Sequence, residues 1–135
     1  MQHVWLKAII LLLLASPIEI VAQQQDSDEV IDSILACFEK HDAATIIEHM
    51  NDPIEIKIDE KKGIYSHSQA KILISNFFER HPFTSFTKNH TSQSGANEFS
   101  VIGTYRSKNS TFSLYFLLKK NEKAFRIYQF YIEKS

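Results

Sequence analysis

Between residues 98 and 133, apolar and polar side chains alternate along three successive segments, 98–106, 111–119 and 124–133. Alternation with a period of two is typical of β-strands, whose successive side chains point to opposite faces of a sheet. Short turn sequences separate the segments, and connections this short join antiparallel neighbours. A further strand at 84–91 precedes them, so this part of the chain is predicted to be a four-stranded antiparallel meander.

The alternation also predicts the register of the last three strands. Two-residue turns at Lys108-Asn109 and Asn121-Glu122 give one face on which only Gly103 and Gln129 are not apolar or aromatic, and we expect this face to be the core. On that face the sequence puts Gly103, Tyr105, Leu114, Gln129 and Tyr131. The second face is half polar, but its apolar members are Ile102, Tyr115, Leu117, Tyr128, Phe130 and Ile132. This second face is too apolar for ordinary contact with water.

Helical spacing dominates the region before the meander. A first helix is expected after a cap at Asp26 or Ser27, and a third after a cap at Ser66 or Ser68. A shorter helix and a small hairpin, with strands at 54–58 and 64–65, lie between them. The predicted order is ααββαββββ, an α+β fold in which three helices pack on a curved antiparallel sheet.

The N-terminus has the pattern of a secretory signal. Lys7 precedes the apolar run 8–15, which Ser16-Pro17 ends, and cleavage after Ala22 would leave a mature start at Gln23. The run is too short to span a bilayer, which needs roughly 20 residues. We therefore predict a signal peptide at 1–22, a single domain at 23–135, a periplasmic or secreted product, and no membrane association after cleavage. The alternative is a buried N-terminal helix.

Composition and motifs exclude several classes of function. The formal net charge of the 135 residues is −1, without the basic excess that nucleic-acid binding requires. Cys37 is the single cysteine, which excludes an intrachain disulfide, and its apolar neighbours predict a buried structural thiol. The six histidines show no metal-binding spacing, so neither a metal site nor a cofactor is expected.

The element order and several short stretches resemble a known family. The stretches are Tyr65-Ser66-x-x-Gln69-Ala70-x-Ile72-Leu73 with Phe77-Phe78, Pro82-Phe83-x-x-Phe86, Tyr115-Phe116-Leu117-Leu118-Lys119, and Tyr128-Gln129-x-x-Ile132-Glu133. The chain resembles the cone-shaped nuclear transport factor 2-like superfamily and, within it, the domain-of-unknown-function family 4783 of exported bacterial proteins. The resemblance implies a fold and an exported location, and it supplies no catalytic residue.

Enzymes of that superfamily place an Asp or His base in the cone, but this predicted core face carries no acid, Lys or His on its three central strands. We therefore expect a non-catalytic ligand-binding or protein-interaction module. The alternative is a small-molecule isomerase, dehydratase or hydrolase, in which Asp59 or His90 would lie beside Tyr105 or Tyr131. His67 is a further candidate base. A structural dimer without a pocket is a third possibility.

Two sites follow from the predicted register. Gly103 leaves space near Leu114 and Gln129, so we expect a small cavity that could hold a small apolar ligand. The buried Gln129 amide needs a hydrogen-bond partner there, which the hydroxyl of Tyr105 or Tyr131, water or the ligand could supply. A packed polar contact without a ligand is the alternative.

The apolar residues of the second face predict a homodimer, since one self-complementary patch suffices for a two-fold pair. The alternative is that residues 23–28 of the same chain cover this face.

Overall fold

The computed structural model of the chain describes the backbone of residues 18–135 and the side chains of residues 26–135. The predicted signal peptide at 1–22 lies outside the described residues, apart from the backbone of residues 18–22. The elements are α1 (Ile18–Glu39), α2 (Ala43–Glu48), β1 (Met50–Ile58), β2 (Lys61–Tyr65), α3 (His67–Arg80), β3 (Phe83–Gln93), β4 (Glu98–Ser107), β5 (Thr111–Lys120) and β6 (Phe125–Lys134). This order confirms the prediction ααββαββββ.

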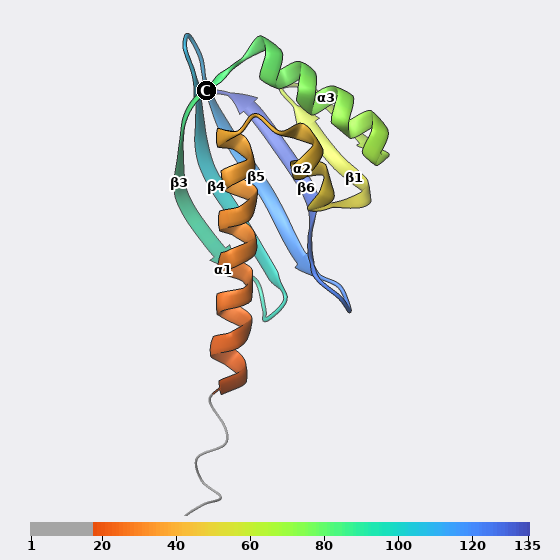
Figure 1. Cartoon of the computed structure of the whole chain (residues 1–135), viewed down its shortest axis with the longest axis vertical. Coiled ribbons are helices and arrows are strands. Elements are labelled where there is room, and N and C mark those ends of the chain that lie inside the picture. Colours follow the sequence, from red (N-terminus) through yellow and green to blue (C-terminus); the bar gives the residue numbers. More distant parts are fainter. Residues whose placement is uncertain (1–17) are drawn as a thin grey trace, which may run out of the picture.

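The six strands form one curved sheet in the order β2-β1-β6-β5-β4-β3. Neighbouring strands are antiparallel except β1 and β6, which run parallel, so the sheet is mixed. The helices lie on one face of the sheet, which we name the inner face, and α3 crosses over β1 (Figure 1). We name the opposite face, which no helix covers in Figure 1, the outer face.

Local capping explains where the two later helices begin. Asp42 precedes α2 and its Oδ1 accepts a hydrogen bond of 3.2 Å from the Thr45 backbone N–H. Ser66 precedes α3 in a capping box, with its Oγ bound to the Gln69 N–H and the Gln69 side chain bound back to the Ser66 N–H. Such reciprocal bonds satisfy two donors that the first turn leaves open. Ser66 is therefore the cap of the third helix, one of the two predicted candidates.

The predicted start of the first helix is wrong. Asp26 and Ser27 lie inside α1, which already begins at Ile18, and its first turns extend past the end of the sheet (Figure 1). Asp26 Oδ2 instead lies 3.5 Å from Lys120 Nζ, and Ser27 is fully buried. The first helix therefore runs through the predicted cleavage site after Ala22.

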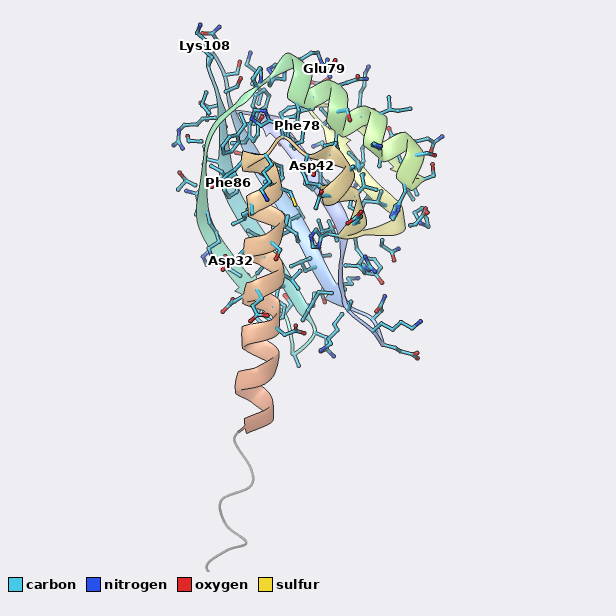
Figure 2. All side chains as sticks on the ribbon, in the orientation of Figure 1. Asp32, Asp42, Phe78, Glu79, Phe86 and Lys108 are labelled. Atoms are coloured by element: carbon cyan, nitrogen blue, oxygen red, sulfur yellow. The ribbon has the colours of Figure 1, made fainter. Side chains whose placement is uncertain are left out.

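Aromatic side chains fill the space between the helices and the sheet. Phe38 from α1 stacks on Phe86 and on Phe130, with ring centroids 5.8 Å and 6.0 Å away. Phe78 and Tyr105 meet the same ring edge-on. Figure 2 shows Phe78 and Phe86 converging from α3 and β3 near the C-terminal end of α1. The centre of the cone is thus a packed core.

The predicted register holds for β4 and β5 but is wrong for β6. Arg106 pairs with Thr111 and Ile102 with Tyr115, as the two-residue turn at Lys108-Asn109 requires. The second turn is longer, since Lys120 pairs with Phe125, and a bulge at Tyr128 adds one residue to β6, so that Leu118 faces Ile127 while Leu117 faces Gln129.

The bulge exchanges the two faces of the second half of β6. One extra residue reverses the alternation that follows it, so Phe130 and Ile132 turn inward and are 0% and 1% exposed. Gln129 and Tyr131 turn to the outer face, where each is half-buried. The bulge therefore buries the apolar side chains of Phe130 and Ile132. It leaves the Gln129 amide and the Tyr131 hydroxyl on the outer face, where polar partners are available.

Candidate functional site

The five residues of the predicted pocket do not come together. Gly103 and Leu114 are paired on the inner face of β4 and β5, whereas Gln129 and Tyr131 lie on the outer face. The space at Gly103 is filled, because a Cβ built there would lie 2.1 Å from Phe86 Cζ. The glycine therefore admits a phenylalanine ring from β3 and opens no cavity.

Tyr105 has a structural role in the core. It is fully buried, and its hydroxyl donates a 2.5 Å hydrogen bond to the His81 carbonyl oxygen at the end of α3. Burial raises the pKa of Tyr105 to about 12, so the phenol stays protonated at neutral pH.

Four of the six residues predicted for a dimer face do lie on the outer face. Ile102 is 43% exposed opposite the half-buried Tyr115, and Leu117 lies opposite Gln129. Tyr128 sits at the bulge with Lys119 Nζ 5.5 Å from its ring centroid. The prediction is wrong for Phe130 and Ile132, which the bulge buries in the core.

Tyr131 lies on the outer face in place of Phe130 and Ile132, which were predicted there. Its ring lies opposite Tyr115, with centroids 5.5 Å apart and planes inclined by 39°. Ile64 on β2 is 71% exposed and pairs with Glu55, whose side of β1 is the outer one. We name these outer-face residues the aromatic band: Ile64, Ile102, Tyr115, Leu117, Tyr128 and Tyr131.

A polar cluster adjoins the aromatic band. The Tyr131 hydroxyl donates a 2.6 Å hydrogen bond to Glu55 Oε2, and Lys62 Nζ lies 3.3 Å from Glu55 Oε1. That hydrogen bond lowers the pKa of the Glu55 carboxyl, and Lys62 acts in the same direction. The Glu55 carboxyl is therefore ionised at neutral pH and accepts hydrogen bonds as a carboxylate. A general base would instead have a raised pKa, closer to neutral pH.

Each candidate base is hydrogen-bonded to a group other than Tyr105 or Tyr131. His67 Nε2 lies 3.0 Å from the Met50 carbonyl oxygen, which ties α3 to β1. His90 is exposed on β3, with Nε2 2.9 Å from Ser92 Oγ. Asp59, at a φ of 53°, accepts a 3.0 Å hydrogen bond from the Lys134 backbone N–H. The constellation that the enzyme alternative requires is not assembled.

Cys37 lies in the core of the domain. It is 5% exposed, and its thiol donates to the Ser33 carbonyl oxygen at 3.2 Å. Burial, with a smaller effect from the Asp42 carboxylate, raises the pKa of the Cys37 thiol, which disfavours the nucleophilic thiolate. Among the described residues, no three His, Cys, Asp or Glu side chains converge as metal ligands would.

A groove that the sequence did not predict lies between α3 and the β1–β2 hairpin. Its volume is about 460 Å³, within the range of small-molecule sites. It is lined by Ile56, Ile58, Asp59, Glu60, Lys61, Tyr65, Leu73, Asn76 and Arg80. The one sequence signal is the spacing of Leu73, Asn76 and Arg80, which puts them on one side of α3 beside the core stripe.

No helix among the described residues is long and apolar enough to cross a membrane.

Comparison with known proteins agrees with this architecture. No curated protein matches the sequence. A DUF4783 family protein from Bacteroides uniformis superimposes with a TM-score of 0.71 at 21% identity, covering 77% of this chain and 95% of that one. An NTF2-like protein of unknown function from Shewanella baltica gives a TM-score of 0.66 at 15% identity, covering 85% and 95%.

A ketosteroid isomerase-like protein from Erwinia carotovora gives a TM-score of 0.65 at 15% identity, covering 79% of this chain and 92% of that one. At these identities the structures show a shared NTF2-like fold. The family model described as Domain of unknown function (DUF4783) matches residues 31–133, which is most of the chain. The chain therefore belongs to the DUF4783 family.

Proposed function

We propose that this protein is an exported, non-catalytic interaction module that forms a homodimer through the outer face of its sheet. The observation that carries the proposal is the aromatic band, whose side chains cross the sheet from β4 to β2 without a helix over them. Tyr side chains bury much area with few rotatable bonds and keep a polar tip, which suits them to interfaces.

A second copy fits this face because the patch carries both signs of charge beside its apolar part. Lys57 and Lys62 lie on the outer face next to Tyr131, and Glu55 and Glu133 accompany them as ion-pair partners. In a two-fold pair each residue meets a residue of the same patch, so cations of one copy can approach carboxylates of the other.

The non-catalytic part of the proposal rests on the distribution of titratable groups. The packed cone holds Tyr105 and Cys37 with raised pKa values, and each candidate base is hydrogen-bonded to another group. Asp59 borders the groove beside α3, where it accepts the Lys134 backbone N–H. General acid–base chemistry requires a titratable group beside its partner within a cavity, and this arrangement does not favour it.

The test compares two exposed isoleucines by analytical ultracentrifugation of residues 23–135 at micromolar concentration. Ile102→Glu places a charge in the aromatic band, whereas Ile72→Glu changes an even more exposed isoleucine, 62% accessible, on α3. We expect a dimer for the wild type and for Ile72→Glu, and a monomer for Ile102→Glu. A monomeric wild type, or a dimer that survives Ile102→Glu, would contradict the proposal.

Export is tested separately by the N-terminus of protein recovered from its host outside the cytoplasm. Cleavage after Ala22 leaves Gln23 as the first residue, and peptide mass spectrometry identifies it. An intact Met1 on such protein would refute the signal-peptide assignment.

A further inference from the structure

Gly63 allows the Tyr65 ring to pack beside the groove between α3 and the hairpin. The glycine lies opposite Ile56 on the inner face of the hairpin, and its lack of a side chain leaves room for the Tyr65 ring. A Cβ built at Gly63 would lie 2.8 Å from the Tyr65 hydroxyl oxygen, so the Tyr65 ring folds back along the strand over the glycine. The ring forms a wall of the groove.

One part of the groove is apolar. Ile56 and Ile58 from β1 and Leu73 from α3 supply aliphatic side chains, and the Tyr65 ring adds an aromatic surface. Among the described residues the Tyr65 hydroxyl has no hydrogen-bond partner, although it borders this space. Apolar walls with a few polar groups are typical of sites that bind small organic molecules.

The other part of the groove carries two cations on different walls. Arg80 comes from α3, and Lys61 comes from β2, where its pairing with Ile58 puts it on the inner face. Arg80 Nε donates to the Asn76 carbonyl oxygen at 3.4 Å, and neither cation has an ion-pair partner among the described residues. Two like charges that border one space repel each other until an anion binds between them.

The two acids of the lining are placed differently. Asp59 is held by β6, since its Oδ1 accepts the Lys134 backbone N–H, and Glu60 lies in the exposed turn between β1 and β2. Both acids line the groove together with the two cations, but Arg80 and Lys61 have no ion-pair partner among the described residues and remain available to an anion. An arginine guanidinium matches a carboxylate in charge and in geometry.

We propose that this groove binds a small apolar carboxylate, with its acid group between Arg80 and Lys61 and its apolar body against Ile56, Ile58 and Leu73. The Tyr65 hydroxyl lies beside the body and offers one hydrogen bond to a polar substituent. The site is separate from the proposed dimer interface, because the groove lies on the inner side of the hairpin and the aromatic band on the outer face.

The experiment is a ¹H–¹⁵N NMR titration of residues 23–135 with three probes that share one apolar body: octanoate, octan-1-ol and octylammonium. We expect octanoate to shift the amide signals of Gly63, Leu73 and Arg80 at the lowest concentration. Octan-1-ol should bind about tenfold more weakly, because it lacks the charge-assisted hydrogen bonds. Equal binding of octanoate and octan-1-ol, tighter binding of octylammonium, or shifts confined to other regions would overturn the proposal.

Variants separate the groove from general surface binding. Arg80→Gln and Lys61→Gln should each weaken octanoate about tenfold, whereas Lys71→Gln, on α3 but outside the groove lining, should bind octanoate as the wild type does. The dispersion of each spectrum reports whether the variant is folded. Folded Arg80→Gln and Lys61→Gln chains that both keep wild-type affinity would overturn the proposal.

Discussion

Gly103 shows how one residue decides whether a core is open or filled. A side chain at this position would meet Phe86 Cζ at 2.1 Å and the Thr87 carbonyl oxygen at 2.8 Å. Neither contact is relieved easily, because Phe86 stacks on Phe38 and the carbonyl belongs to the backbone of β3. The glycine is required by close packing between β3 and β4, and its φ plays no part.

Gly103→Ala is therefore expected to lower the free energy of unfolding by about 1–3 kcal/mol, through overpacking. Gly63→Ala is the matched control, since the atoms it meets belong to the ring end of the Tyr65 side chain, which can move. Urea unfolding of both variants measures the difference. Equal stability of the two variants would contradict this prediction, because it would show that β3 can shift to accommodate the added methyl group.

Tyr105 is expected to make the stability of the domain sensitive to alkaline pH. Its pKa in the folded protein is about 12, above the value of about 10 for an unperturbed tyrosine. A raised pKa stabilises the fold fully below the unfolded value, and that contribution is lost as the pH rises through the folded value. The relevant window is therefore about pH 10 to pH 12.

Tyr105→Phe tests this expectation. At neutral pH the variant lacks the hydrogen bond to the His81 carbonyl and should be less stable by about 1 kcal/mol. Above about pH 10 the phenol ionises in the unfolded wild type but not in the folded protein, which favours unfolding of the wild type and not of the variant, so the gap should shrink. Unfolding curves at neutral and alkaline pH measure it, and a gap that stays constant would contradict the assignment.

At the scale of the element, the bulge at Tyr128 decides the two faces of β6. Without it, Gln129 and Tyr131 would point into the core and Phe130 and Ile132 would point outward. The bulge lies where β6 also pairs in parallel with β1, whose own register shifts between Met50 and Glu55. Both irregularities together fit β6 between its two neighbours.

A pair of adjacent alanine substitutions tests this reversal. Phe130→Ala should lower the free energy of unfolding by about 3–5 kcal/mol, because it leaves a cavity beside Phe38. Tyr131→Ala removes a half-buried outer-face ring and should cost clearly less. Both are measured in the Ile102→Glu background, so that dimerisation does not contribute. A larger loss of unfolding free energy for Tyr131→Ala than for Phe130→Ala would contradict the bulge and support the register predicted from the sequence.

The contrast between β5 and β6 shows what the sequence can predict. In β5 polar residues occur only at outer-face positions before Lys119 and Lys120, and its register with β4 was predicted correctly. In β6 aromatic or aliphatic residues occupy both faces, so the hydrophobic pattern cannot reveal an inserted residue. A finer signal was present: the buried members are Phe125, Ile127, Phe130 and Ile132, and both tyrosines, which carry hydroxyls, stay outside.

The candidate site was predicted only in part for the same reason. Ile102, Tyr115 and Leu117 follow from the alternation of β4 and β5, whereas the place of Tyr131 depends on the bulge. The groove depends on how α3 packs over the hairpin, which is a tertiary contact with no local pattern. Leu73, which is half-buried on α3, borders the groove.

At the scale of the whole molecule, β6 is the strand that joins the two halves of the sheet. It pairs with β1 from the N-terminal half and with β5 from the meander. It also supplies Phe125, Ile127, Phe130 and Ile132 to the common core. The helices and the hairpin therefore cannot complete their packing against the meander without this strand.

A chain of residues 23–123, which lacks β6, is expected to lose cooperative folding. The edges of β1 and β5 would be left unpaired, and four buried side chains would be missing from the core. Thermal unfolding followed by circular dichroism measures cooperativity, with residues 23–135 as the control. Addition of a peptide of residues 124–135 should restore a transition, and a sharp transition without the peptide would refute this dependence.

The central position of the last strand has a consequence for when the chain folds. If the chain is exported as we propose, it crosses the membrane with its N-terminus first, so β1 arrives early and β6 last. The β1–β6 pairing joins residues such as Glu55 and Gln129, and contacts that distant in sequence form late. The topology itself would keep a translocating chain unfolded until residues 125–134 have passed, and only then would the sheet close.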